Sequence, residues 1–319
     1  NTIDEVVRIS AAMSASLPMY PQYTWSVPEL PPLVAWLAKH ADLVQLATPG
    51  PMGLAGLIAA RMLGLPMIAQ YHTEVPEYAA RLTGLPFVKD LVTPIVGWFY
   101  QQAELCLAPS RAVEERLRSL GVSAIQRVRR GVDLSLFDPR RRQRNAGPVA
   151  LYVGRISREK NIDVLRDAWR AIHARRPDAT LIVAGDGPMA LEAPGLVRVG
   201  VLHGEALATA FASCDVLVFP SETETFGNVV VEAAASGVPA IVSSKGASHE
   251  HVTAETGIVA DGAAAIARAV LGLFADPARA RAMGAAARIH AQRYDLEAAV
   301  DATWAIYRDV VRIPHAVAS

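Results

Sequence analysis

The sequence predicts an α/β protein of two domains, each a parallel sheet flanked by helices. The chain has 319 residues, which exceeds the size at which a single hydrophobic core keeps growing. Short runs of Val, Ile and Leu alternate with segments of helical period, a pattern typical of strand-helix-strand units. The alternation starts again at Val149, so a second domain is expected there.

The first domain is expected at residues 1–138. Strands are predicted at 42–46, 67–71, 104–108 and 124–128, and helices at 52–63 and 111–120. A doubly wound domain usually opens with a strand and a Gly-rich turn. A proline-rich loop is expected here instead, with Pro18, Pro21, Pro28, Pro31 and Pro32. We therefore expect this domain to lack its first strand-helix-strand portion.

The second domain is expected at residues 149–294, after a polar, arginine-rich linker at 139–148. Strands are predicted at 149–153, 180–184, 196–199, 216–219 and 240–242, and helices at 263–274 and 277–293. Residues 295–319 are expected to form a helix that crosses back to the first domain, because their apolar side chains recur at helical spacing and need a covering surface. These side chains are Leu296, Val300, Trp304, Tyr307 and Val311.

Composition excludes several classes of protein. With 52% hydrophobic and 19% charged residues, the chain has enough apolar surface to fold. The 31 basic residues equal the 31 acidic ones, so the attraction for polyanions that supports nucleic-acid binding is missing. Cys106 and Cys214 form no Cys-x-x-Cys motif, which fits a reducing, cytoplasmic location. No apolar stretch is long enough to span a membrane and no signal peptide is visible, but contact with the inner face of the cell membrane stays possible.

The most informative stretch is 216–239. A strand ends at Phe219, a polar loop follows, and a helix is expected to begin near Phe226 and Gly227. That helix opens at the carboxyl edge of the sheet, where its free N–H groups favour a phosphate. Glu224 precedes the helix and Glu232 lies about two turns further on. A lone pair of this kind is more often a helix-capping acid and a solvated Glu, but Glu232 is embedded in an apolar run, where an unpaired carboxylate is costly.

A second group of residues follows the strand at 149–153. Gly154 ends the strand, the next loop holds Arg155 and Lys160, and a helix is expected from about Asn161. Two cations at the mouth of a sheet suit a pyrophosphate, because Arg binds it with two N–H donors and Lys adds a compact charge. By itself this spacing would more often be an exposed loop with two solvated charges.

Together these two groups resemble the retaining nucleotide-sugar glycosyltransferases of family 4, which have the GT-B fold. Further segments that resemble the family are Ala108-Pro109-Ser110, Gly131-Val132-Asp133 and Gly185-Asp186-Gly187-Pro188. Residues 47–51 and 71–76 look like the branch that glycosylates diacylglycerol or related lipids. The resemblance covers about residues 18–294, except for an early Gly-rich loop that no segment before Pro18 matches.

The resemblance implies a fold, a substrate class and roles for individual residues. It implies two facing Rossmann-like domains, a nucleotide-diphosphate sugar as donor, a lipid or glycan acceptor, and neither a metal nor a cofactor. Arg155 and Lys160 would neutralise the departing diphosphate, and Glu232 would bind the ribose hydroxyls. Glu224 and the backbone N–H groups of 226–229 would hold the transferred sugar and the β-phosphate. The remaining residues that it implies at the site are Gly154, Phe226, Gly227, Asn228, Val229 and, from the first domain, His72.

Other interpretations are less well supported. Gly185-x-Gly187-x-x-Ala190 imitates a dinucleotide fingerprint, but nearby prolines leave little helix and no acidic residue ends the next strand. His249-Glu250-His251 lacks the spacing of a helical metal site and is interpreted as a loop near the donor. A nucleotide-sugar 2-epimerase and an inactive sugar-nucleotide-binding subunit remain alternatives. The sequence leaves open the choice of UDP or GDP, the sugar, the acceptor, the oligomeric state and the activity of the chain as given.

Overall fold

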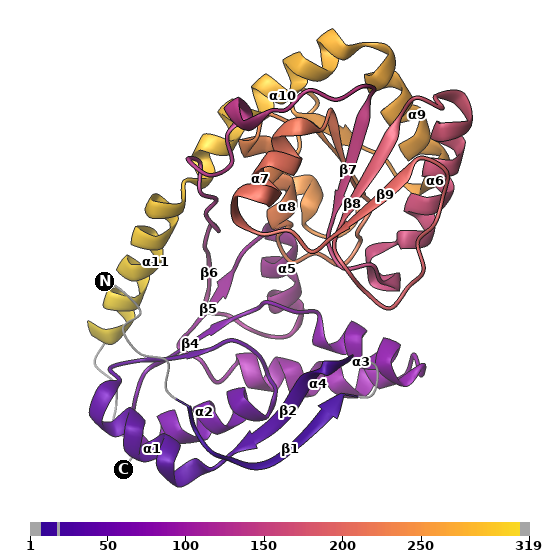
Figure 1. Cartoon of the computed structure of the whole chain (residues 1–319). Coiled ribbons are helices and arrows are strands. Elements are labelled where there is room, and N and C mark those ends of the chain that lie inside the picture. Colours follow the sequence, from indigo (N-terminus) through magenta and orange to yellow (C-terminus); the bar gives the residue numbers. More distant parts are fainter. Residues whose placement is uncertain (1–7, 18–19, 313–319) are drawn as a thin grey trace. The chain divides into compact units, whose positions relative to one another are not determined.

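The computed structural model describes residues 8–17 and 20–312, which divide into two compact units (Figure 1). One unit holds the described residues up to Val128 together with those from Ala302 onward. The other unit spans Arg129–Asp301. The predicted α/β class is confirmed, because each unit contains a parallel sheet with helices.

In the described part of the first unit, four parallel strands lie in the order β3-β4-β5-β6. They are β3 (Val44–Leu46), β4 (Met67–Gln70), β5 (Leu105–Ala108) and β6 (Ile125–Arg127), each inside its predicted range. The helices are α1 (Leu30–His40), α2 (Pro51–Leu63), α3 (Val75–Thr83), α4 (Val88–Tyr100) and α5 (Arg111–Ser119). Ser110 caps α5, since its side chain accepts a hydrogen bond from the Val113 N–H.

The prediction of a proline-rich loop near the start of the chain was wrong. Strands β1 (Ala11–Leu17) and β2 (Tyr20–Pro28) form an antiparallel pair, and α1 has proline in its first turn. Both strands of a two-stranded ribbon are edges, where a missing N–H is tolerated. Proline is tolerated in the first turn of a helix, because the N–H that it lacks would have no partner inside the helix. Of the five prolines, Pro18 lies outside the described residues.

The second unit has a six-stranded parallel sheet within residues 149–259, all of them described. Its strands are β7 (Val149–Val153), β8 (Thr180–Ala184), β9 (Leu196–Gly200), β10 (Val216–Phe219), β11 (Ala240–Val242) and β12 (Gly257–Val259). Their order is β12-β11-β10-β7-β8-β9. The direction of winding therefore reverses between β7 and β10, which places the topological switch point of the sheet there. The sequence did not predict β12.

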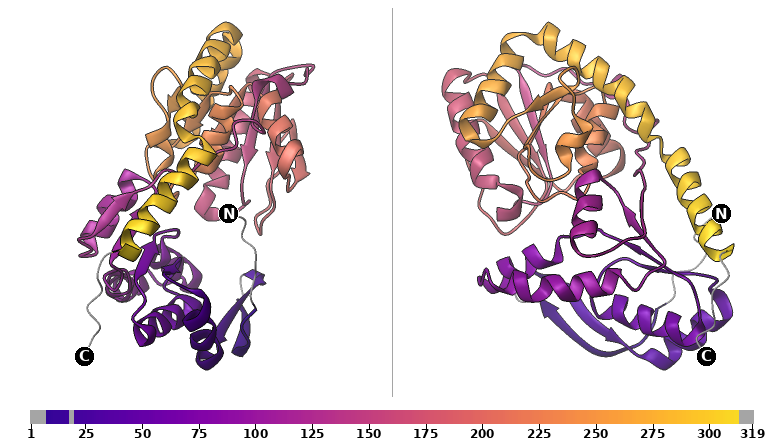
Figure 2. Two further views of the ribbon diagram at one scale, coloured as in Figure 1. Left: turned by 90° about the vertical axis from the view of Figure 1, so that its left-hand side faces the viewer. Right: turned by 180° about the vertical axis from the view of Figure 1, so that it is seen from behind.

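Helices cover both faces of this sheet (Figures 1 and 2). They are α6 (Ile162–Arg175), α7 (Gly204–Ser213), α8 (Asn228–Ala235), α9 (Gly262–Ala275) and α10 (Pro277–Ala291). Figure 1 shows α6 and α9 on one face and α7 and α8 on the other. The strands β7, β10 and β11 are buried along their whole length, as expected for strands covered on both sides.

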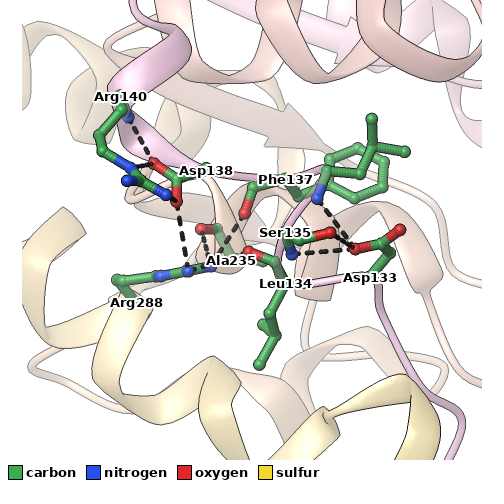
Figure 3. A network of polar contacts seen from close by, with 9 residues as sticks. Asp133, Leu134, Ser135, Phe137, Asp138, Arg140, Ala235 and Arg288 are labelled. Carbon is green, nitrogen blue, oxygen red and sulfur yellow. Dashed lines mark hydrogen bonds and ion pairs between the residues drawn. The ribbon is translucent and has the colours of Figure 1, made fainter.

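The expected linker at 139–148 lies within the second unit, and the chain passes between the units at 128–129. Side-chain hydrogen bonds explain why this stretch is bound to the sheet domain. Arg142 donates to the Cys214 carbonyl at 2.8 Å, and the Gln143 N–H donates to the Ser213 hydroxyl at 3.0 Å. Residues 134 and 137, just before the expected linker, accept hydrogen bonds at their backbone carbonyls from Arg288 of α10 (Figure 3).

The last helix, α11 (Leu296–Arg312), belongs to the second unit up to Asp301 and to the first from Ala302. In the first unit Ile306 and Val310 are buried in a cluster with Ile68, Leu107 and Val128. The prediction of the buried face was wrong, because most of the side chains named for it are exposed. These are Leu296, Val300, Trp304 and Val311. Tyr307 is partly buried within the first unit, and its hydroxyl donates to Gln45 Oε1 at 2.6 Å.

Among the described residues, no helix combines the length and the apolar character needed to cross a membrane.

Candidate functional site

The loops that follow β7 and β10 meet at the switch point of the second sheet. In open α/β sheets this crevice is the usual place for a ligand. A cavity of about 210 Å³ opens there. Its lining residues are Arg130, Val153, Gly154, Arg155, Lys160, Phe219, Glu224, Thr225, Phe226, Gly227, Asn228 and Val229. The structure thus brings together the two groups of residues that the sequence singled out.

Lys160 and Glu224 form an ion pair at this cavity. The Lys160 ammonium donates to Glu224 Oε1, which also accepts a hydrogen bond from the Ser221 hydroxyl at 2.7 Å. The exposed fractions of the two side chains are only 19% and 16%. An ion pair at this depth contributes little net stability, because desolvation offsets the attraction. The pair places one positive and one negative side chain at the wall of the cavity.

Two further contacts fasten the β7 loop to the β10 loop. Asn161 Nδ2 donates to the Pro220 carbonyl at 3.0 Å, and the Thr223 hydroxyl donates to the Glu159 carbonyl at 3.2 Å. Asn161 has a φ of 55°, in the left-handed region that Asn adopts more readily than most residues. With the ion pair, these bonds fix the position of Lys160 relative to Glu224.

Gly154 and Gly227 occupy backbone conformations that side chains disfavour. Their φ angles are 147° and 93°. A Cβ on Gly227 would also lie 2.5 Å from the Ser248 hydroxyl. Gly227 immediately precedes α8, whose first N–H groups have no partner inside the helix. Those donors and the helix dipole make this end of the cavity suitable for an anion.

Arg130 lines the cavity and was missed by sequence reasoning. Partial burial lowers the pKa of its guanidinium below the ordinary value. A signal was available, because Arg130 directly precedes the Gly131-Val132-Asp133 segment. With Arg155 and Lys160 it gives the cavity three cationic side chains against the single carboxylate of Glu224. This balance favours an anionic ligand.

Two residues named from the sequence do not line this cavity. Glu232 lies inside α8, and burial raises the pKa of its carboxyl from 4.5 to about 7. His72 belongs to the first unit and is the second residue after β4. It follows Tyr71, whose hydroxyl donates to Glu74 Oε2 at 2.8 Å. The roles expected for Glu232 and His72 stay predictions.

The raised pKa of Glu232 predicts a pH-dependent stability. Between about pH 4.5 and 7 the unfolded chain releases this proton while the folded protein retains it. The carboxyl of Glu232 therefore makes its full contribution to the free energy of unfolding below pH 4.5. This contribution falls by about 3 kcal/mol as the pH rises to 7. Over this pH range, the free energy of unfolding measured in urea should increase for Glu232→Gln relative to wild type.

Glu205→Gln is the matched control for this experiment, because Glu205 is highly exposed on α7. This control should keep the pH dependence of the wild type. A difference between wild type and Glu232→Gln that does not change from pH 4.5 to 8 would contradict the prediction.

Comparison with family models covers both units. Residues 147–276 match a model described as glycosyl transferases group 1. Residues 3–136 match the model of glycosyltransferase family 4. The two models thus meet close to the expected linker.

Within the aligned regions, named relatives are about one third identical to this chain. A sulfoquinovosyl transferase of Arabidopsis thaliana is 32% identical over 75% of this chain and 50% of its own length. A GDP-mannose-dependent alpha-mannosyltransferase of Mycobacterium tuberculosis is 34% identical over 77% of this chain and 67% of its own length. The Mycolicibacterium smegmatis protein of that name is 33% identical over 81% of this chain and 71% of its own length. The match therefore spans between half and about 70% of these relatives.

Solved structures show the same architecture. Anabaena HepE in complex with UDP-glucose has a TM-score of 0.75 at 19% identity, over 88% of this chain and 82% of that one. Sucrose-phosphate synthase from Thermosynechococcus elongatus has a TM-score of 0.73 at 26% identity, over 88% and 78%. The fold is GT-B, with two Rossmann-like domains. The match to the family 4 model and the identity with the mycobacterial relatives show that this chain belongs to glycosyltransferase family 4.

Proposed function

We propose that the protein transfers a sugar from a UDP- or GDP-linked donor to a lipid or glycan acceptor, with retention of configuration at the anomeric carbon. The observation that carries this proposal is the cationic cavity at the switch point, which combines Arg130, Arg155 and Lys160 with the first N–H groups of α8. Relatives named as a sulfoquinovosyl transferase and as mannosyltransferases support it.

The cavity suits a departing nucleoside diphosphate. As the bond between the anomeric carbon and the phosphate breaks, negative charge builds on the diphosphate and positive charge on the sugar ring. Arg155 binds phosphate oxygens with two N–H donors, and Lys160 adds a compact charge. These groups bind the transition state more strongly than the ground state, which accelerates the reaction. Because they supply the positive charge that the leaving group needs, we propose a reaction without a metal ion.

The carboxylates and the histidine act on the other parts of the substrates. In this proposal Glu224, paired with Lys160 at the cavity, accepts hydrogen bonds from hydroxyls of the transferred sugar. Glu232 accepts hydrogen bonds from the ribose hydroxyls. His72 acts from the acceptor side, in the first unit.

Binding and turnover together test this function. Thermal shift with UDP, GDP and their sugars should identify one nucleotide that raises Tm, and its labelled sugar should then pass to an acceptor in an extract of lipids or glycans. The anomeric configuration of the product and transfer in EDTA test retention and metal independence. An epimerised donor formed without acceptor would favour the 2-epimerase. Binding without turnover would favour an inactive binding subunit, and no nucleotide binding would overturn the proposal.

We also propose contact with the inner face of the cell membrane through an apolar surface of the first unit. Large apolar side chains lie exposed along one face of α4 and on the residue that precedes it. Each is three or four residues from the next, which is the spacing of one helix face. They are Phe87, Leu91, Ile95 and Trp98. The neighbouring helix α2 exposes further apolar side chains, and Arg61 of α2 donates to Gln102 just after α4 at 2.5 Å. An exposed apolar helical face ending in Trp suits the boundary between headgroups and acyl chains.

The double substitution Leu91→Ser and Ile95→Ser should weaken binding to vesicles. Removing two apolar side chains that the membrane would bury costs about 3 kcal/mol or more, so the partition coefficient should fall by about a hundredfold. Co-sedimentation with vesicles of phosphatidylglycerol and phosphatidylethanolamine measures it. Ile289→Ser, at an exposed apolar residue of α10 in the second unit, is the control and should bind as wild type does. Equal sedimentation of both variants would contradict this surface.

A further inference from the structure

A buried histidine contacts the backbone at the edge of the candidate donor cavity. His251 ends the short 3-10 helix Ser248–His251 after β11, and its side chain is buried. Its Nε2 lies 2.8 Å from the Phe226 carbonyl oxygen, and its Nδ1 lies 2.8 Å from the Tyr294 hydroxyl. A carbonyl only accepts hydrogen bonds, so Nε2 carries the ring proton and donates it.

The other ring nitrogen then has one role. In the neutral ring Nδ1 accepts, and the Tyr294 hydroxyl donates to it. Burial lowers the pKa of His251 to about 4, which keeps the ring neutral near pH 7. Tyr294 therefore supplies the donor that Nδ1 needs in the tautomer that the Phe226 carbonyl selects.

The bond to the Phe226 carbonyl also fixes the next N–H. A trans peptide is planar, so the carbonyl of Phe226 and the N–H of Gly227 point in opposite directions. Because His251 holds the carbonyl on its own side, the Gly227 N–H is directed away from His251. Phe226 and Gly227 both line the cavity. The orientation of one of its backbone donors is thus set by a side chain that is absent from the lining.

Tyr294 also contacts the chain segment that carries another lining residue, Arg130. Its backbone carbonyl accepts from the Val132 N–H at 2.7 Å, two residues after Arg130. Its ring packs edge-on against Phe226 at 6.0 Å and His251 at 5.2 Å between ring centroids. Tyr294 therefore holds the segment that carries Arg130 against the loop that carries Phe226.

We propose that His251 and Tyr294 are positioning residues that direct the Gly227 N–H toward the diphosphate of the donor. This rests on the proposed function. The ligand group is the anionic diphosphate, since the nucleoside has no negative charge for this donor to meet. Loss of His251 leaves the Phe226 carbonyl without its partner and frees the peptide to rotate.

Calorimetry with two ligands separates positioning from a general structural effect. The ligands are the diphosphate that the wild type binds, UDP or GDP, and the matching nucleoside. For His251→Leu, the Kd for the diphosphate should rise about tenfold or more, while the Kd for the nucleoside stays unchanged. His251→Gln retains an N–H donor for the carbonyl and should restore most of the affinity. Tyr294→Phe removes the hydrogen-bond partner of His251 Nδ1 and so loosens the ring, and its Kd for the diphosphate should fall between those of wild type and His251→Leu.

Trp169→Phe is the control for loss of a buried side-chain bond elsewhere in the second unit. Trp169 Nε1 donates to the Pro194 carbonyl at 2.9 Å, outside the lining of the cavity. This variant should lose stability without changing the ratio of the two Kd values. Equal weakening of diphosphate and nucleoside, or wild-type diphosphate binding in both His251→Leu and Tyr294→Phe, would overturn the positioning role.

Failure of the proposal can be distinguished from failure of the proposed function. If the wild type binds neither UDP nor GDP, both fail together. If the wild type binds a diphosphate and the His251 and Tyr294 variants bind it as tightly, only the positioning role fails. If His251→Leu does not fold, the Kd values of wild type, His251→Gln and Tyr294→Phe for the diphosphate decide the question. A Tyr294→Phe variant that binds the diphosphate as tightly as wild type would refute the positioning role.

Discussion

Replacing Lys160 with alanine should reduce kcat/KM for sugar transfer by about a hundredfold to a thousandfold, the range found when one transition-state donor is removed. The Lys160 ammonium lies in the cavity with an exposed fraction of 19%, so bulk water cannot easily replace its charge. The negative charge on the leaving diphosphate is greatest in the transition state, and the loss should therefore fall largely on kcat.

Glu224→Ala should also abolish most transfer, since it removes the proposed hydroxyl acceptor and leaves Lys160 without its partner. Initial rates with the donor identified by thermal shift measure both variants, and circular dichroism checks that each is folded. Wild-type rates in both would refute the assigned roles.

The chain offers a matched control for this pair. Lys245 and Glu222 form an ion pair at 3.2 Å on loops after β11 and β10, but the Lys245 side chain is well exposed and neither residue lines the cavity. Exposed pairs contribute about 0–1 kcal/mol. Lys245→Ala should therefore change kcat/KM by about twofold at most. A loss as large as that of Lys160→Ala would show that charge near the sheet edge in general, rather than the cavity pair, is responsible.

Replacing Arg288 with alanine should lower the free energy of unfolding by about 3–5 kcal/mol. The guanidinium donates to the carbonyls of Leu134, Phe137 and Ala235 at 3.0, 2.8 and 2.6 Å, and lies 3.7 Å from Asp138 (Figure 3). Its removal leaves three carbonyls and a carboxylate without this partner. Urea unfolding of the purified protein measures the loss.

Arg140→Ala is the control, because Arg140 pairs with the same Asp138 carboxylate at 2.9 Å while its side chain is 87% exposed. Hydrogen bonds from Arg140 lower the pKa of Asp138 to about 2, but an exposed ion-pair partner contributes little net stability. Arg288→Ala should therefore destabilise much more than Arg140→Ala. Similar losses in the two variants would mean that the ion pair, rather than the three carbonyl contacts, carries the stability.

Several features of the site could be predicted because the chain places them next to recognisable elements. Arg155 and Lys160 follow a buried strand, and Glu224 precedes a helix that opens after another. The carboxyl ends of parallel strands meet at one edge, so loops far apart in sequence were expected to meet. Arg130 was not predicted, because its neighbours form no strand or helix and its place depends on the backbone bond between Val132 and Tyr294.

The packing of α11 shows the same limit in the fold. Its apolar residues repeat at helical spacing, and the prediction of a helix is confirmed. The face that is buried centres on Ile306 and Val310 rather than on the longer stripe that includes Trp304. A repeat tells how the side chains are arranged around a helix, but which of them are covered depends on the shape of the surface on which it packs.

The sequence by itself determined the α/β class, the strands and helices named from their periods, and the ends of the two strands where the cavity opens. These follow from local patterns, since the spacing of apolar residues selects helix or strand and glycine permits the sharp turns. Only the tertiary structure decided that Lys160 pairs with Glu224, that Arg130 joins them, and that His251 holds the Phe226 carbonyl. Each of these depends on atoms brought together by packing across the sheet, which no local spacing specifies.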